Sequence, residues 1–381
     1  MQGNELEAPV VAAPAAAPPA IPPPALPAQP PPHEPRRLPM EFTGRAGEYF
    51  GIWIVNLVLS VLTLGIYSAW AKVRTERYFY GNTRLGGSGF EYLASPIAIL
   101  KGRLVAYAVA IVLGLTAHFG LLVVYLPLLL LVLLLLPWLL QRTLRFRARY
   151  SAWRGLRFRF VNGVDDAYLN FLFRPMLQIP TMYMLLPWVR KHQQEYVVTG
   201  HRFGGLRFGF AGDLGPYYIP FAISLGIGFA AYIGMVAAMF AGVALSGAGG
   251  KGGEPGGWAL AAMLGPVFLA YAVILVLPVF LRTRYTNLMW ANTRLGPHRF
   301  ECTLRARDVI WIYFSNGLAI VLSLGLLVPW AMVRVARYRA AHFQMLALGD
   351  LDDFVAEAER AEGATSAELV DVLDLDVDIG L

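Results

Sequence analysis

Long apolar segments separated by short basic ones dominate the pattern of hydrophobic and polar positions. Two of the apolar segments exceed the roughly 20 residues that cross a bilayer once, so each predicts a helical hairpin. Three others are about as long as one crossing, and we call them the single blocks. The hairpin segments lie at about 104–140 and 217–281, and the single blocks at 49–70, 167–189 and 309–333.

Each single block contains an internal break, at Leu64-Gly65, at Pro180 and at Leu324-Gly325. If the three blocks enter the membrane and return, all 27 basic residues that flank the apolar segments lie on the cytoplasmic side. If each block crosses once, 17 basic residues face 10 on the other side. We therefore predict a mainly α, polytopic membrane protein with two transmembrane helical hairpins and three re-entrant or kinked apolar segments. Seven single crossings are the alternative.

An internal repeat accompanies the apolar segments. Residues 56–78 and 316–338 share 11 of 23 positions without a gap, and 82–91 and 292–301 share seven of ten. After each apolar helix come basic residues, a short strand, a glycine turn and an F-x-F strand, which is typical of a β-hairpin. The repeat predicts short cytoplasmic β-hairpins that pair into a small sheet or ring. The acidic C-terminal tail either folds back as a cap on this basic face or is a solvated end.

Composition agrees with a membrane protein and divides the chain into three parts. Hydrophobic residues make up 57% and charged residues 15%, which leaves too little polar surface for a soluble domain or a nucleic-acid-binding domain. The net charge of +7 combines a body of +19 at 42–349 with a tail of −10 at 350–381. Residues 1–41 hold 13 of the 26 prolines, which predicts a disordered tail that is a spacer or binds a protein partner.

Several segments resemble the YjgN family, a domain-of-unknown-function family of bacterial inner-membrane proteins. The resemblance implies a multi-pass protein of the bacterial inner (plasma) membrane and implies no reaction. It covers about 42–354, so the proline-rich tail is a departure from the family pattern. The segments that carry it are F-x-G-x-x-x-E-Y-F (42–50), T-L-G-I-Y-x-x-W-A (63–71), R-Y-x-Y-x-N (77–82), N-T-R-L-G-x-H-R-F (292–300) and L-G-D-L-D-D (348–353).

Catalytic motifs are missing from the sequence. It contains neither H-E-x-x-H nor G-x-S-x-G, and its single cysteine, Cys302, is interpreted as a packing residue. We therefore expect no enzyme activity, no cofactor and no metal site. Polar residues at membrane depth are the remaining candidates, because buried polar groups in lipid are costly. They form a candidate intramembrane polar core of Asn56, Arg174 and Asn316.

Arginines after the apolar helices are explained by membrane orientation alone, and binding of anionic lipid head groups or phosphates is the sharper hypothesis. The candidate contacts are Arg74, Arg77, Arg84, Arg294, Arg299, Arg334 and Arg337. We expect the bilayer, including anionic lipids, as the main partner and no nucleic acid. The predicted function is transport or lipid handling, since broken helices are typical of transporter sites. The alternative is a scaffold or regulatory protein whose tails recruit soluble partners.

Overall fold

A computed structural model describes residues 35–248 and 257–363 of the chain. The predicted disordered segment, apart from its last residues, lies outside the described residues. So do the glycine-rich loop of the second hairpin and the last 18 residues of the acidic tail. The predictions for these segments stay predictions.

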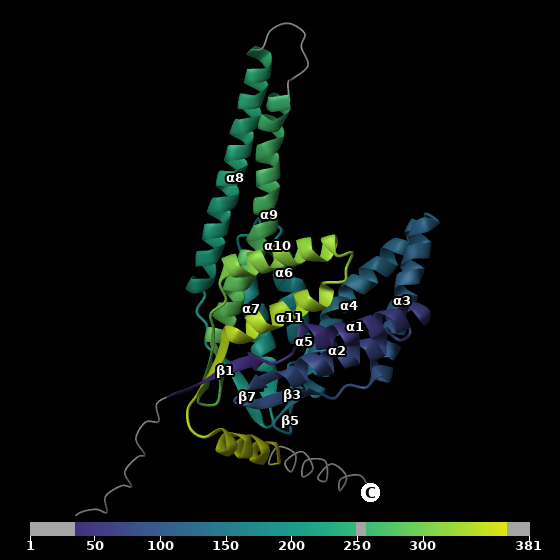
Figure 1. Ribbon diagram of the computed structural model, residues 1–381, viewed down its shortest axis with the longest axis vertical. Coiled ribbons are helices and arrows are strands. Elements are labelled where there is room, and N and C mark those ends of the chain that lie inside the picture. Colours follow the sequence, from purple (N-terminus) through teal and green to yellow (C-terminus); the bar gives the residue numbers. More distant parts are fainter. Residues whose placement is uncertain (1–34, 249–256, 364–381) are drawn as a thin grey trace, which may run out of the picture. The chain divides into compact units, whose positions relative to one another are not determined.

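Within the described residues, four helices are long and apolar enough to cross a membrane. They form two helical hairpins, as predicted for the two longest apolar segments. Figure 1 shows α8 and α9 side by side, while α3 and α4 converge at their connecting turn. The first pair is joined by a three-residue turn at 119–121. The helices are α3 (Pro96–His118), α4 (Leu122–Arg149), α8 (Gly215–Ala248) and α9 (Gly257–Ala291).

Each single block folds as an apolar helix that breaks and continues as a second, more polar helix. At 17 residues, α1 is about 25 Å long, which is shorter than the roughly 30 Å hydrocarbon core. The first block forms α1 (Ala46–Leu62) and α2 (Ser68–Asn82), and the last forms α10 (Ala306–Leu322) and α11 (Val328–Ala341). The middle block forms α5 (Val164–Tyr168), the π-helix η1 (Leu169–Phe173), α6 (Arg174–Met176) and α7 (Leu186–Gly200).

The breaks in the first and last blocks have the same backbone conformation. Leu64 and Gly65 have φ values of 49° and 90°, and the residues 260 positions later, Leu324 and Gly325, have 50° and 93°. The Gly65 N–H donates to the Ser60 carbonyl at 2.7 Å, and the Gly325 N–H donates to the Ile320 carbonyl at 2.8 Å. Such left-handed positions favour glycine because a Cβ is crowded there.

The middle break places a tyrosine at φ 63°, Tyr183, where the other two have glycine. We expect Gly65→Ala to lower the free energy of unfolding by about 1–2 kcal/mol and Tyr183→Gly to leave it unchanged or raise it. Thermal unfolding of the detergent-solubilised protein measures both effects. Gly51→Ala is the control, because Gly51 lies inside α1 with open space around it and a helical alanine is stabilising. Equal losses for Gly65→Ala and Gly51→Ala would contradict this account of the breaks.

Ten strands in the described part of the chain close into one antiparallel barrel. Around the barrel the order is β1, β10, β9, β8, β7, β6, β5, β4, β3 and β2. The sequence predicted separate hairpins in a sheet or ring, and the structure joins them without a free edge. The strands are β1 (Arg36–Phe42), β2 (Thr83–Leu85), β3 (Ser88–Tyr92), β4 (Ser151–Trp153), β5 (Leu156–Phe160), β6 (His201–Phe203), β7 (Leu206–Phe210), β8 (Thr293–Leu295), β9 (His298–Cys302) and β10 (Phe343–Ala347).

Every helical unit leaves the barrel after one strand and returns to an adjoining strand. For the first unit, Met40 of β1 pairs with Leu85 of β2, although α1 and α2 lie between them in the chain. For the last unit, Phe300 of β9 pairs with Met345 of β10 across α10 and α11. The kinked units and the long hairpins therefore begin and end at the same barrel.

Strand β1 begins at Arg36, six residues before the predicted domain boundary at residue 42. Within the barrel, residues alternate between a buried apolar side and an exposed basic side. In β5, Leu156 and Phe160 are buried while Arg157 and Arg159 are exposed. This alternation is the period of two expected of a strand with one buried face. The F-x-F elements therefore point phenylalanines into the barrel.

A helix at 351–363, inside the predicted acidic tail, lies against one end of the barrel. Phe354 stacks on Phe203 with ring centroids 5.8 Å apart, and Ala358 is fully buried. A Cβ on Gly205 would come within 2.3 Å of the Ala361 carbonyl carbon, so the β6–β7 turn permits this close approach only without a side chain. The folded start of the tail thus caps the hairpins, which is the first of the two alternatives for this tail.

Candidate functional site

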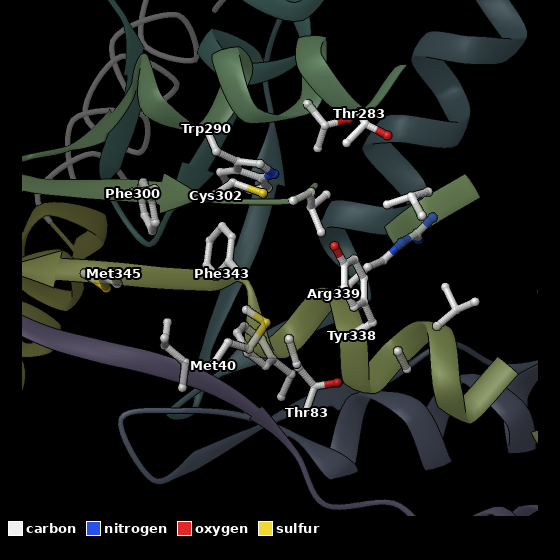
Figure 2. A pocket seen from close by; sticks show the side chains of 18 of the residues that line it. Met40, Thr83, Thr283, Trp290, Phe300, Cys302, Tyr338, Arg339, Phe343 and Met345 are labelled. Atoms are coloured by element: carbon white, nitrogen blue, oxygen red, sulfur yellow. The ribbon is translucent and has the colours of Figure 1, made fainter. Parts of the chain in front are cut away.

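The barrel encloses a cavity of about 640 Å³ that extends to the ends of three helices. This volume lies within the roughly 300–1,000 Å³ of small-molecule sites. We call it the barrel cavity. Its wall is largely aromatic and aliphatic, and Figure 2 shows Trp290, Phe300, Phe343 and Met345 around it. It forms because alternate residues of every strand face inward and the aromatic side chains leave the centre unfilled.

Polar groups line one region of the barrel cavity, which we call its polar end. Figure 2 shows Thr283, Tyr338 and Arg339 there, away from Phe300 and Met345. Arg282 of α9 and Tyr313 of α10 complete the polar end. The α9 helix is long and apolar enough to cross a membrane, and Arg282 follows its apolar stretch. Arg339 lies near the end of α11, after the apolar stretch of the last single block. The polar end therefore lies where the barrel meets the apolar helices.

Helix 351–363 contributes to the opposite region of the cavity through Phe354. Its charged residues form ion pairs with arginines at the β4–β5 turn and in β5: Asp352 with Arg154, and Glu362 with Arg159. Exposed ion pairs contribute little, so packing of Phe354 and Ala358 is the main attachment. The cavity thus has an apolar closure at one end and cationic groups at the other.

Beside Phe354, the buried His298 links β9 to the start of the helix. Its Nδ1 accepts the Leu348 N–H at 3.1 Å, and its ring lies edge-on to Phe354 at 4.2 Å. Burial lowers the pKa of His298, and the nearby Glu357 opposes that shift. The folded protein therefore favours the neutral imidazole, while the unfolded chain titrates near 6.5.

We expect packing of helix 351–363 to weaken as the pH falls from 7.5 to 5.5, because protons then bind the unfolded histidine more readily than the buried one. Hydrogen exchange of amides 351–363 at the two pH values measures this. His298→Gln removes the titrating group and is expected to flatten the difference. A pH dependence that survives in His298→Gln would assign it to the carboxylates of the helix instead.

The three residues of the predicted polar core each bond within their own helical unit. The Asn56 and Asn316 side-chain amides donate to the Ala71 and Ala331 carbonyls, both at 3.4 Å. Arg174 donates to the Asn170 side chain and stacks over a tryptophan of α7. No hydrogen bond joins Asn56, Arg174 and Asn316 to one another within the described residues. The structure therefore uses them to hold each kinked pair together.

Among the seven candidate arginines, Arg334 combines a hydrogen bond to the Asn316 side-chain oxygen at 2.9 Å with stacking over Trp330. Arg337 donates to the Gly44 carbonyl at 3.2 Å, and both arginines line a second groove of about 460 Å³ beside α10. Arg74 approaches the Tyr67 hydroxyl at 3.4 Å. Like Arg74, Arg77 on α2 is exposed.

The three remaining candidates lie on the exposed outer side of the barrel. Arg294 and Arg299 are directly opposite each other on β8 and β9, and Arg84 is opposite Glu41. Like charges directly opposite are destabilising unless an anion lies between them. The hypothesis that this pair contacts phosphates stays open. In the described residues, the ion pairs of helix 351–363 use Arg154 and Arg159 instead.

Sequence reasoning missed Arg282, Arg339 and Phe354 as cavity residues. Arg282 and Arg339 looked like ordinary positive-inside residues, since each follows an apolar helix. Phe354 stood in a segment interpreted as an acidic tail. An apolar residue recurring at 351, 354, 355 and 358 is the helical signal that could have identified it. Cys302 is half-buried in the cavity wall, where burial raises its thiol pKa.

Comparisons with known proteins agree with the predicted resemblance. The chain is 30% identical to "Inner membrane protein YjgN" of Salmonella typhimurium over 154 residues, which is 38% of this chain and 36% of that protein. It is 33% identical to the protein of the same name from Escherichia coli K12 over 138 residues, 36% of this chain and 34% of that one. These matches span about a third of the length of the curated relatives. No solved structure matches.

The prediction of a multi-pass inner-membrane protein is confirmed by these relatives together with the four apolar helices of the described residues. The match to a family extends much further along the chain than the matches to the individual proteins. Over residues 37–372, from β1 to beyond helix 351–363, the sequence fits one family throughout, and the chain belongs to that family, described as "Bacterial protein of unknown function (DUF898)".

Proposed function

We propose that this protein handles lipid by binding an apolar chain in the barrel cavity, at the cytoplasmic face of the inner membrane. The observation that carries the proposal is a cavity of about 640 Å³ with a largely apolar wall, bounded on one side by membrane-type helices. An apolar chain in the bilayer can enter such a cavity without passing through water, which would otherwise oppose its transfer.

The proposed topology has four crossings, α3, α4, α8 and α9, and three kinked units that enter the membrane and return. It is supported by the barrel, since each kinked unit starts and ends at adjoining strands. It is also supported by the length of α1, which is too short to span the hydrocarbon core. The barrel and all its arginines then lie in the cytoplasm, in accord with the positive-inside rule.

Binding rather than catalysis is the proposed activity. The described lining of the barrel cavity includes two arginines, two tyrosines and one thiol but no carboxylate and no histidine, so the commonest general acids and bases do not face the cavity. Recruitment of soluble partners by the tails is the alternative role. It depends mainly on residues 1–34 and 364–381, which lie outside the described residues.

The native cysteine provides the test. Cys302 is the single cysteine of the chain and lines the barrel cavity, so lipid in the cavity should slow its reaction with a maleimide. We expect slow labelling in native nanodiscs, several-fold faster labelling after delipidation in detergent, and a lipid that co-purifies by mass spectrometry. In a Cys302→Ser background, Pro297→Cys at the exposed β8–β9 turn is the control and should label equally in both states. Equal labelling of Cys302 with and without lipid would overturn the proposal.

A further inference from the structure

The barrel cavity carries a net positive charge at one end. Its described lining includes Arg282 and Arg339 but no aspartate or glutamate. Beside the polar end, Asp308 accepts the Tyr338 hydroxyl at 3.4 Å and pairs with the exposed Arg307. Two guanidinium groups at the end of an apolar cavity, without an acidic residue in its wall, favour an anion there.

The two guanidinium groups keep most of their donors free. The Arg339 Nη2 donates to the Tyr313 hydroxyl at 3.1 Å, which leaves the remaining N–H groups of this fork without an acceptor among the described residues. The Arg282 side chain makes no hydrogen bond or ion pair within the described residues. The Thr286 hydroxyl donates at 2.7 Å to the Arg282 backbone carbonyl, which leaves the guanidinium group free. A planar fork of free donors matches the oxygens of a carboxylate or a phosphate.

The neighbouring hydroxyl groups do not compete for that anion. Thr283 donates to the Val279 carbonyl at 2.7 Å within its own helix. Tyr338 bonds to the Arg305 backbone and to Asp308. The two arginines therefore keep most of the unused donors at the polar end, together with the Tyr313 hydroxyl, which accepts from Arg339 and donates to no group among the described residues. Two residues beyond Arg282, Arg284 stacks over Phe280 at 5.5 Å and lies outside the cavity lining.

We propose that the ligand of the barrel cavity is an amphiphile with an anionic head group, oriented with its apolar chain inside the barrel and its anion between Arg282 and Arg339. This inference rests on the proposed lipid binding and adds the charge and the orientation of the ligand. Phe354 and helix 351–363 form the apolar floor against which the chain ends. Anionic phospholipids and free fatty acids share this chemistry.

Binding of spin-labelled or fluorescent lipids to the full chain in detergent tests the inference. Phosphatidylglycerol and phosphatidylcholine with identical acyl chains give the ratio of anionic to zwitterionic affinity, and a fatty acid of the same chain length separates a carboxylate source from a phosphate source. We expect the wild-type protein to favour one of the anionic ligands about tenfold or more. The double variant Arg282→Gln, Arg339→Gln should lose that preference and keep its affinity for phosphatidylcholine.

Arg284→Gln is the matched control, since it removes a positive charge from the same helix outside the cavity, and it should keep the preference. Thermal unfolding confirms that each variant is folded. An unchanged anionic preference in the double variant overturns the inference about the head group while lipid binding stands. Equal affinity of the wild-type protein for both phospholipids and the fatty acid also overturns it. Failure of every lipid to bind the wild-type protein contradicts the proposed function itself.

Discussion

Phe354→Ala should release helix 351–363 from the barrel. The Phe354 ring is 4% exposed and contacts Phe203 and His298, and it belongs to the same apolar core as the inward-facing barrel residues. Truncating a buried phenylalanine to alanine costs about 3–5 kcal/mol. The ion pairs of Asp352 and Glu362 are partly exposed and cannot offset such a loss.

Hydrogen exchange of the amides at 351–363 measures the release, and the expected result is loss of protection throughout this helix with the barrel strands retained. Release also opens the apolar end of the barrel cavity to water, so maleimide labelling of Cys302 should become faster. Glu359→Ala on the exposed side of the same helix is the control and should change neither readout. Protection at 351–363 that is the same in Phe354→Ala and in the wild-type protein would show that the helix is held by something other than this core.

Single-cysteine variants in a Cys302→Ser background should place the barrel on one side of the membrane. We expect Arg157→Cys, Arg207→Cys and Pro297→Cys to be protected from a membrane-impermeant maleimide in intact spheroplasts and to react after lysis. Leu121→Cys, at the turn between α3 and α4, should react from outside. All four positions are exposed. The reason is geometric, because β5, β7 and the β8–β9 turn belong to one closed barrel.

Seven single crossings predict a different result that the same experiment detects. In that topology residues 72–165 and 190–307 lie on opposite sides, so Arg157→Cys and Arg207→Cys would react under opposite conditions. Such a result would mean that the barrel does not form in the membrane. It would also remove the basis of the proposed lipid cavity, since the cavity wall combines strands from both halves of the chain.

The sequence predictions that agree with the structure rest on patterns within single segments of the chain. Hydropathy identified the helix pairs α3–α4 and α8–α9, because the requirement for apolar length is a property of each segment alone. Breaks at Gly65 and Gly325 were visible because glycine tolerates the left-handed conformation that both adopt. The recurring short strand, glycine turn and F-x-F element predicted the β-hairpins. The acidic tail was placed over the hairpins from charge alone, although apolar packing of Phe354 attaches its folded part.

Tertiary structure decided how these pieces combine. Closure of the barrel depends on the pairing of β1 with β10, whose partners Arg36 and Ala347 are 311 positions apart in the chain. No local pattern encodes such a pairing, since strand register and neighbours are set by the packing of the whole inner face. The cavity follows from that closure, and so does the placement of Arg282 and Arg339 in one cavity wall. Considered alone, each arginine is an ordinary charge at the end of an apolar helix. Only the folded barrel brings both to the end of one apolar cavity.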